Sequence, residues 1–351
     1  MLDFTSALYL GLAHDHASLR PWKALTAGKP AALHTLPGTP SLAAELAALM
    51  GCEAASLGPS TLHLFFDLFE TWPAGRATIY ADAELYETAW WGVGRAAARH
   101  VPVRRFRHYD ADSLSSLIRR DACLGRRPVV VADGFCPGCG LAAPIAAFLE
   151  CIRSCGGWLV IDDTQALGVL GRGPSARVPY GLGGGGTMQW LNVRSKQIIV
   201  ISSLAKAFGA PLAVFGGTRS FVVDFERRSL TRVHCSPASA AAVHAAEQAL
   251  LFNQHAGDRT RQFLSQLVAR LRQKVARAVR LCGGYFPVQS TPGVSAVPAV
   301  TLQERLAAAE IATVLQRDRA TGQPRVGMLL TAQHSIRDVD RLAAGILAAI
   351  Q

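Results

Sequence analysis

Lys206 is the residue whose surroundings suggest chemistry most directly. It follows the apolar run 197–201 and two serines, the second of which is Ser203. A strand that ends in small hydroxyl residues and then presents one lysine can hold an aldehyde as an imine. A second apolar run, 158–161, ends in Asp162. Because open α/β sheets bind their ligands at the carboxyl ends of strands, we expect this acid and this lysine to share a site.

This pairing indicates a particular cofactor. Pyridoxal 5′-phosphate (PLP) needs a lysine for its aldehyde and an acid for its pyridine nitrogen. The two motifs lie 44 residues apart, each directly after an apolar run. A surface lysine and a strand-end aspartate that caps a turn are the alternatives to this interpretation. The residues flanking Lys206, Ala205 and Ala207, leave the lysine no obvious solvated face.

The elements that must position these residues form an alternating pattern. Short apolar runs indicate strands at 78–81, 101–106, 128–132, 158–161, 198–201 and 212–215. Helical spacing lies between them, as at 41–50, which begins at a serine N-cap, and at 144–155, which has proline in its first turn. Nearly all-apolar strands that alternate with helices indicate a mostly parallel sheet covered on both faces. The predicted fold class is therefore α/β.

Both ends of the chain depart from this pattern. Residues 2–12 read as an arm or edge strand, and the Gly- and Pro-rich stretch 28–40 reads as a loop. Past residue 236 we expect helices at 237–252 and 258–281, strands at 293–300 and 325–331, and a last helix with a capping box from Ser335 to Asp338. The predicted organisation is an arm and loop (1–40), a large domain (41–235) and a smaller α+β domain (236–351).

Composition limits the function classes. Half of the 351 residues are apolar, so a sizeable core is expected and global disorder is not. The net charge is 36 − 25 = +11, which fits an Arg-rich surface on a soluble enzyme or attraction to an acidic partner. No basic run is interleaved with aromatic residues, so nucleic acid is not an expected partner. No secretory signal or membrane span is expected, and the predicted location is cytoplasmic.

The eight cysteines are better explained as reduced thiols than as a disulfide framework in a chain of this size. Cys136 and Cys139 form a CxxC motif, and Cys151 and Cys155 follow, so a zinc or redox site is one interpretation. Small buried thiols are the other, and no metal is assigned here. The run of four glycines at 183–186 lacks the Lys-Ser/Thr of a P-loop, so a flexible loop is expected rather than a phosphate cradle.

Several segments resemble, in order, those of the α-oxoamine synthases, the family of 8-amino-7-oxononanoate synthase and serine palmitoyltransferase. These are fold type I PLP enzymes close to the class II aminotransferases. The segment around Asp162 resembles the family's aspartate signature, and the segment around Lys206 resembles its lysine motif. The other matching segments are 6–12, 38–39, 133–135, 142–144, 329–334 and 338–342. The resemblance implies a fold type I transferase over nearly the whole chain, without the helix that usually precedes the first segment.

The resemblance also implies roles for single residues. Asp162 holds the pyridinium nitrogen protonated. Lys206 forms the imine and then moves the α-proton of the substrate. The turn of Ser60, Thr61 and Leu62 binds the cofactor phosphate with backbone N–H groups at a helix N-terminus, unless Ser60 is an ordinary N-cap.

Three further positions complete the cofactor site that the resemblance implies. Ser203 offers its hydroxyl to the phosphate. Tyr86 stands where the family has a histidine that stacks on the ring, a task that another aromatic side chain can perform. Asp133 belongs to the substrate-side loop and is counted among the cofactor-binding residues.

The sequence departs from the family pattern in places that affect function. Gln165 replaces a histidine near the ring's phenolic oxygen; it can donate a hydrogen bond but cannot take up a proton. Pro137 lies near a position often filled by serine. Gly327 stands where the family has the arginine that binds the substrate carboxylate. Arg325 lies two residues upstream on the same strand face, about 7 Å away at about 3.3 Å per residue, and is the candidate replacement.

Three functions follow as alternatives. The first is condensation of an amino acid with an acyl thioester of coenzyme A or a carrier protein. The second is aminotransfer or other PLP chemistry on a non-standard amine, which Tyr86 and Gln165 favour. The third is an inactive partner subunit, against which Lys206 argues. A homodimer is expected, with the regions around Thr39 and Ser236 reaching across to the other subunit.

Overall fold

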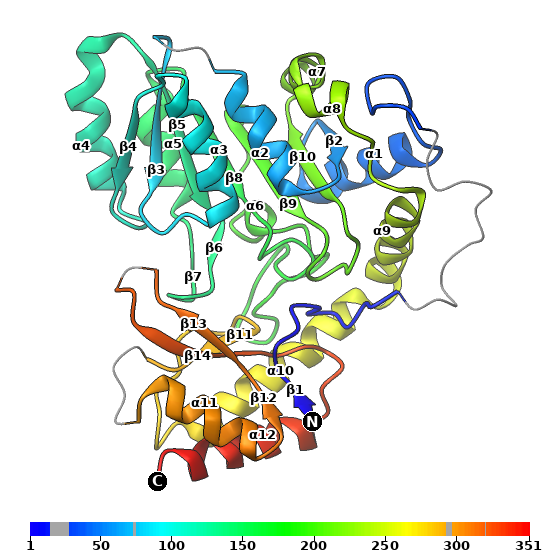
Figure 1. Ribbon diagram of the computed structural model, residues 1–351, viewed down its shortest axis with the longest axis vertical. Coiled ribbons are helices and arrows are strands. Elements are labelled where there is room, and N and C mark those ends of the chain that lie inside the picture. The colour runs from blue at the N-terminus through cyan, green and yellow to red at the C-terminus, as the bar shows by residue number, and fades with distance from the viewer. Residues whose placement is uncertain (15–27, 73–74, 293–296, 320) are drawn as a thin grey trace.

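The computed structural model describes residues 1–14, 28–72, 75–292, 297–319 and 321–351 (Figure 1). Its main element is a seven-stranded sheet with the order β2-β10-β9-β8-β5-β3-β4. These strands are β2 (Ala54–Gly58), β3 (Ala77–Asp82), β4 (Val103–Phe106), β5 (Arg127–Asp133), β8 (Trp158–Asp162), β9 (Ile198–Ser203) and β10 (Ala213–Gly217). Strands β4, β3, β5, β8 and β9 run parallel, and β10 is antiparallel to both neighbours. The predicted mostly parallel sheet is confirmed.

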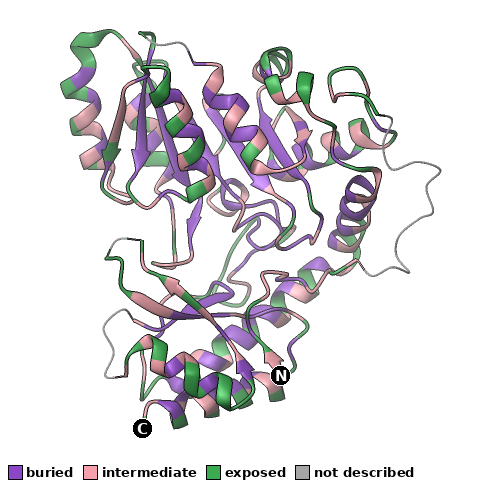
Figure 2. Cartoon of the chain, viewed as in Figure 1, coloured by how far each residue is buried: buried purple, intermediate pink, exposed green. Residues whose placement is uncertain are grey.

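Helices cover both faces of this sheet. They are α1 (Thr39–Met50), α2 (Thr61–Glu70), α3 (Glu87–Ala98), α4 (Ala111–Asp121), α5 (Ile145–Arg153), α6 (Thr187–Trp190), α7 (Arg219–Arg228) and α8 (Leu230–His234), and a 3₁₀ turn at Ala122–Leu124 follows α4. In β5, Val129 and Val131 pack into one core cluster, and Val130 and Ala132 pack into the other. Successive strand residues face opposite sides, so a sheet with two covered faces needs unbroken apolar strands. Figure 2 shows the central strands buried over most of their length.

A second, smaller sheet lies beneath the first in Figure 1. It is antiparallel, with the order β11 (Val288–Ser290), β14 (Pro324–Leu329) and β13 (Val314–Arg317). Its helices are α10 (Asp258–Val275), α11 (Ala299–Ala308) and α12 (Ile336–Ala349), and α9 (Ala240–Phe252) joins α10 through a π-helical turn at Asn253–Gly257. A hairpin of β6 (Phe135–Cys136) and β7 (Leu141–Ala142) reaches from the large sheet toward this smaller one.

The N-terminal arm connects the two sheets. Strand β1 (Leu2–Asp3) pairs in parallel with β12 (Ile311–Ala312) beside the small sheet. The carbonyl of Phe4 accepts from the Leu329 N–H at 2.9 Å. Farther along, the Tyr9 hydroxyl donates to Gln165, which follows β8. The arm therefore begins at the small sheet and ends at the site edge of the large one.

Most predicted elements are present within a few residues of their expected bounds, and the capping box of Ser335 and Asp338 at α12 is confirmed. Two predictions are wrong. The strand predicted at 293–300 lies partly outside the described residues, and its described part, 297–300, is not a strand, because α11 begins at Ala299. The strand that precedes this range is β11. Helix α10 ends at Val275 rather than at residue 281. The predicted division of the chain at residues 40 and 235 stays a prediction.

The loop predicted at residues 183–186 is confirmed, and the structure shows how it is held. The N–H of Gly183 donates to the Asp258 carboxylate at 2.8 Å, and the Asn253 amide donates to the Gly183 carbonyl at 2.9 Å. Among the described helices, none has both the length and the apolar character that crossing a membrane requires.

Candidate active site

The centre of the candidate site is a pair of buried acids on neighbouring parallel strands. Asp133 ends β5 and Asp162 ends β8, and the two residues are paired in register. Both are buried. The Asp162 carboxylate accepts a hydrogen bond from the Thr164 N–H at 3.0 Å. Two carboxylates held side by side without water need cations or protons to compensate them.

Lys206 supplies one such cation from the loop that follows β9. Burial lowers the pKa of its amine, although the nearby Asp162 and Asp133 act in the opposite direction and Arg319 lowers it further. The lysine and the acid predicted to share a site are close enough for each charge to affect the pKa of the other. Gly209 shapes this loop: its φ is +63°, and a Cβ there would lie 1.8 Å from the Leu12 carbonyl oxygen of the N-terminal arm. Only glycine allows so close an approach.

The surroundings of the two acids act on their pKa values in opposite directions. Burial raises the pKa of Asp162, while hydrogen bonds from Thr164 and the charges of Lys206 and Arg319 lower it. Burial and the proximity of Asp162 raise the pKa of Asp133 to about 7, against the effect of Arg319. A further positive partner beside Asp162, such as a protonated ring nitrogen, would favour its ionised form.

Tyr86 lies directly before α3 and faces these charges. Its ring is 42% exposed. The Lys206 Nζ lies 5.6 Å from its centroid, and the Arg319 guanidinium carbon lies 4.9 Å from it. Its backbone N–H donates to Asp133 Oδ1 at 3.2 Å. An aromatic ring next to the lysine can stack on a flat ligand ring.

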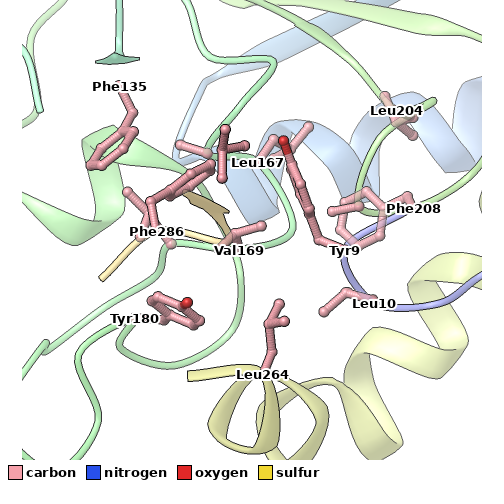
Figure 3. Packing of buried hydrophobic residues seen from close by; sticks show 14 of the residues in the cluster. Tyr9, Leu10, Phe135, Leu167, Val169, Tyr180, Leu204, Phe208, Leu264 and Phe286 are labelled. Atoms are coloured by element: carbon pink, nitrogen blue, oxygen red, sulfur yellow. The ribbon is translucent and has the colours of Figure 1, made fainter. Parts of the chain in front are cut away.

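Gln165 is fixed by the N-terminal arm. The Tyr9 hydroxyl donates to Gln165 Oε1 at 2.8 Å. The acceptor of the glutamine is thus in use, which leaves its amide nitrogen as a donor. The Tyr9 ring packs edge-on against Phe286 at 5.6 Å, inside the cluster that Figure 3 shows. Tyr9 was part of the family resemblance, but its contact with Gln165 was not foreseen.

The expected phosphate cradle sits at the N-terminus of α2. Ser60 is the extended residue before the helix, and in the described structure no side chain caps this end. Its hydroxyl instead pairs with His63 Nδ1 at 2.8 Å. Leu62 is partly exposed. An uncapped helix N-terminus offers N–H groups to an anion.

Ser203 lies between the aspartate and lysine motifs. Its N–H donates to the Thr164 hydroxyl at 3.0 Å, and its own hydroxyl accepts from the Ala205 N–H at 3.2 Å. These bonds connect the ends of β8 and β9. They leave the hydroxyl proton of Ser203 available to a phosphate oxygen.

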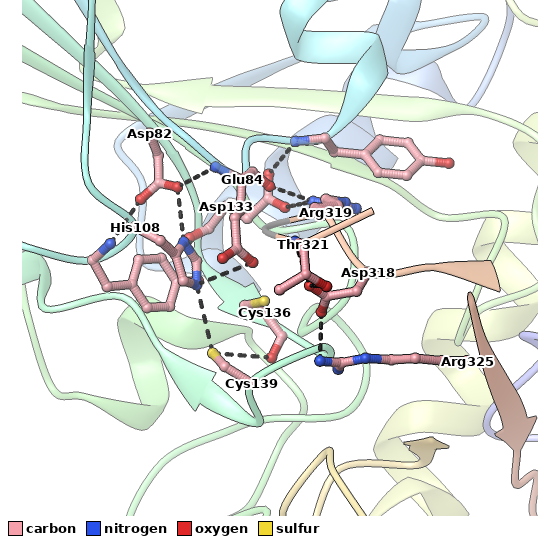
Figure 4. A network of polar contacts seen from close by, with 12 residues as sticks. Asp82, Glu84, His108, Asp133, Cys136, Cys139, Asp318, Arg319, Thr321 and Arg325 are labelled. Atoms are coloured by element: carbon pink, nitrogen blue, oxygen red, sulfur yellow. Dashed lines mark hydrogen bonds and ion pairs between the residues drawn. The ribbon is translucent and has the colours of Figure 1, made fainter. Parts of the chain in front are cut away.

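Two arginines at the β13–β14 hairpin, Arg319 and Arg325, contact different partners. Arg325, the predicted carboxylate-binding residue, lies on β14, and its guanidinium contacts Asp318 at 2.6 Å. Arg319 lies in the loop between β13 and β14 and contacts Asp133 at 2.9 Å and the Glu84 carbonyl at 2.5 Å (Figure 4). Arg319 was not a sequence candidate. Since β13 was not predicted, nothing in the sequence placed this loop over the site.

The four cysteines considered as one site do not form a single group. Cys136 and Cys139 lie with His108 at the β6–β7 hairpin. Cys151 lies on α5 and donates to the Ala111 carbonyl at 3.5 Å, and Cys155 is exposed beyond that helix. The CxxC motif therefore has a histidine as its neighbour rather than the second cysteine pair.

The chain has relatives of known identity. A family model described as aminotransferase class I and II matches residues 17–346. The 8-amino-7-oxononanoate synthase of Paraburkholderia xenovorans is 29% identical over 286 residues, covering 78% of this chain and 67% of that protein. The synthase of the same name from Yersinia enterocolitica is 29% identical over 361 residues, covering 97% and 87%.

Solved structures show the same fold. Serine palmitoyltransferase of Sphingomonas wittichii superposes with a TM-score of 0.85 at 19% identity, covering 99% of this chain and 86% of that one. The 8-amino-7-oxononanoate synthase of Francisella tularensis gives a TM-score of 0.78 at 18% identity, covering 99% and 96%. The predicted fold type I architecture and the family resemblance are confirmed.

Proposed function

Because the chain belongs to the class I and II aminotransferase family, on its α-oxoamine synthase side, we propose that it condenses an amino acid with an acyl thioester, using PLP. The observation that carries this proposal is the pair formed by the buried Asp162 and the partly buried Lys206 at one edge of the parallel sheet. Near full-length similarity to 8-amino-7-oxononanoate synthases supports the reaction class.

The residues present fit the cofactor. When bound, PLP supplies an electron sink that stabilises negative charge at the substrate α-carbon. Asp162 would pair with its ring nitrogen, Lys206 with its aldehyde carbon, and the N-terminus of α2 with its phosphate. The complete set proposed to hold it is Ser60, Thr61, Leu62, Tyr86, Asp133, Asp162, Gln165, Ser203 and Lys206.

Lys206 is the group proposed to move the α-proton. Burial lowers the pKa of its amine, so it gives up and takes back a proton more readily than an ordinary lysine. Gln165 cannot exchange protons at neutral pH, so it orients through its amide nitrogen instead. Tyr86 would cover one ring face and exclude water from it.

A substrate carboxylate needs a cation near the lysine. Arg319 lies over Tyr86 and pairs with Asp133. Arg325 is already paired with Asp318. We therefore expect Arg319 to bind the carboxylate, with Arg325 positioning its loop. The net charge of +11 suits a thioester donor that carries phosphates, such as coenzyme A or an acidic carrier protein.

Aminotransfer is the second candidate. Gln165 and Tyr86 both replace residues of the synthase pattern. Gln165 accepts a hydrogen bond from Tyr9, and the Tyr86 ring lies near Lys206. On this alternative the substrate amine would be consumed without any thioester. An inactive subunit is the third candidate, and the presence of Lys206 in the site argues against it.

The proposed assembly is a homodimer. The segment before α1 is tied to α8 by backbone bonds from Ala32 to Arg232 and from Ala31 to Cys235. Leu33, Leu230 and Val233 are exposed there, although each is apolar. Adjacent exposed apolar side chains favour contact with another chain. Light scattering coupled to size exclusion should give twice the 37.4 kDa chain mass, and a monomer would contradict this assembly.

The reaction is tested with purified protein reconstituted with PLP. Amino acids are added singly, with and without an acyl-coenzyme A, and free thiol and carbon dioxide are measured. Condensation predicts that both are released only when the thioester is present, and that Lys206→Ala releases neither. Conversion of PLP to its amine form without thioester would support aminotransfer instead. Failure of every amino acid and thioester in both assays would overturn both candidates.

A further inference from the structure

A second group of reactive side chains lies at the same edge of the large sheet, next to the candidate active site. It comprises His108, from the loop between β4 and α4, and Cys136 and Cys139, from the β6–β7 hairpin. One ligand atom from each lies within 4.8 Å of the others. The segments are distant in sequence, so the fold brings them together rather than the CxxC spacing alone.

The distances suit one ion. Zinc binds sulfur at about 2.3 Å and nitrogen at about 2.1 Å, so these two ligands of a tetrahedral zinc lie about 3.5 Å apart. The Cys139 Sγ and the His108 Nε2 are 3.5 Å apart. The carboxylate Oε2 of Glu84 lies 3.9 Å from the same nitrogen. The group therefore offers two sulfurs and one nitrogen close together, and the Glu84 carboxylate lies beside the histidine, where it can turn in as a fourth ligand.

The histidine is oriented as metal ligands are. Its Nδ1 pairs with Asp82 Oδ1 at 2.8 Å, so its Nε2 is directed at the thiols (Figure 4). Asp82 is itself buried and also accepts from the Tyr109 N–H at 2.9 Å. A carboxylate behind an imidazole fixes the ring and its tautomer in zinc sites.

We propose that His108, Cys136, Cys139 and Glu84 form a structural zinc site. Binding converts the two thiols to thiolates and releases their protons to solvent, with no change in oxidation state. Two thiolates and one carboxylate exceed the charge of Zn²⁺ by one unit, which suits a partly exposed site. Thiolate ligands disfavour magnesium and calcium, which prefer oxygen.

The site would brace a wall of the candidate active site. The hairpin that carries both thiols starts two residues after Asp133. The Tyr109 hydroxyl, next to His108, donates to the Asp133 carbonyl at 2.9 Å. Phe135 stacks on Phe286 of the small-sheet region at 4.4 Å. Zinc at this point would fix β3, β4 and the hairpin relative to Asp133. This proposal does not depend on which reaction the protein catalyses.

The test is the metal content of the full chain, purified under reducing conditions from cells grown with added zinc. Mass spectrometry of the metals should find about one zinc per chain. Replacement with Co²⁺ should give the intense near-ultraviolet band of thiolate–cobalt charge transfer. Cys139→Ser and His108→Gln should each lose most of the bound zinc and this band.

Cys155→Ser is the matched control, because Cys155 is an exposed thiol outside the group. It should retain the zinc. Circular dichroism tests whether each variant is folded. If either Cys139→Ser or His108→Gln does not fold, the zinc content of the other variant still tests the proposal. Zinc that persists unchanged in a folded Cys139→Ser or His108→Gln would overturn the proposal. So would a zinc-free wild-type protein whose only change on oxidation is a Cys136–Cys139 disulfide two mass units lighter, which would identify a redox pair instead.

Discussion

At the scale of single residues, the candidate site is a balance of buried charges. Asp133 and Asp162 lie side by side, and Lys206 and Arg319 compensate them. Such a group of charges is costly to build without a ligand, because the two buried carboxylates have lost water. Proteins retain costly clusters of this kind where they bind or react. The sequence predicts that Lys206 and Asp162 belong to the site, but it does not predict Arg319.

Arg319 and Arg325 can be told apart by matched substitutions. Arg319→Gln should raise KM for the amino substrate about 10- to 100-fold, because a charge-assisted hydrogen bond is worth about 1.5–3 kcal/mol. Arg325→Gln loses its pairing with Asp318 but no proposed substrate contact, so its KM should change less. Steady-state kinetics of both variants measure this. A larger increase in KM for Arg325→Gln would instead indicate that Arg325, the residue predicted from sequence, binds the substrate carboxylate.

Asp163 gives a prediction about pH and stability. Burial raises its pKa to about 7 from an ordinary 3.8, against hydrogen bonds from Thr187. Between these two values the folded state keeps a proton that the unfolded state has released. The stability of the protein therefore falls as pH rises through this range. Asp163→Asn removes this loss while its side-chain oxygen can still accept from the Thr187 N–H.

The measurement is denaturant unfolding of both proteins between pH 5 and pH 8. The free energy of unfolding of Asp163→Asn relative to wild type should increase with pH over this range. A difference that is constant with pH would show that Asp163 titrates normally in the folded protein.

At the scale of elements, one buried arginine ties three segments together. Arg261 of α10 is 1% exposed. It donates to the Gly168 carbonyl at 3.0 Å, to Asn253 Oδ1 at 2.6 Å and to Asp258 Oδ1 at 2.5 Å. Gly168 belongs to the loop that follows Asp162, so α10 supports the aspartate motif from the outside.

Arg261→Met should therefore destabilise the protein by about 3 kcal/mol or more, because it leaves buried acceptors without a donor. Thermal unfolding measures this. The exposed neighbour Arg259 is the control, and Arg259→Met should stay within about 0.5 kcal/mol of wild type. Equal stability of the two variants would mean that the Gly168 loop needs no support from α10.

The elements differ in how visible they are in the sequence. Strands β8 and β9 are apolar runs that end in polar residues. Both faces of these strands are covered, so nearly every residue is apolar and the strands are easy to recognise in the sequence. Strands β2 and β13 are partly exposed and were not predicted. Consequently the loop that follows β13, and with it Arg319, was also missed.

At the scale of the whole molecule, the fold could be predicted and the site only in part. The motifs around Asp162 and Lys206 are local in sequence, and the parallel sheet brings them together. The contact between Arg319 and Asp133 spans 186 positions, and the one between Cys139 and His108 spans 31. Neither leaves a local pattern, because the partners meet only after the sheet edge and the hairpin have formed.

The proposed function depends on one covalent link, between Lys206 and PLP, and this link can be measured directly. The protein is reconstituted with PLP, reduced with borohydride, digested and mapped by mass spectrometry. The account predicts that the reduced cofactor is attached to the peptide that carries Lys206, and that Lys206→Ala carries none there. Asp162→Asn should retain the attachment but lose activity by about 100-fold or more. Cofactor found on another lysine, or no attachment in the folded wild-type protein, would contradict the account.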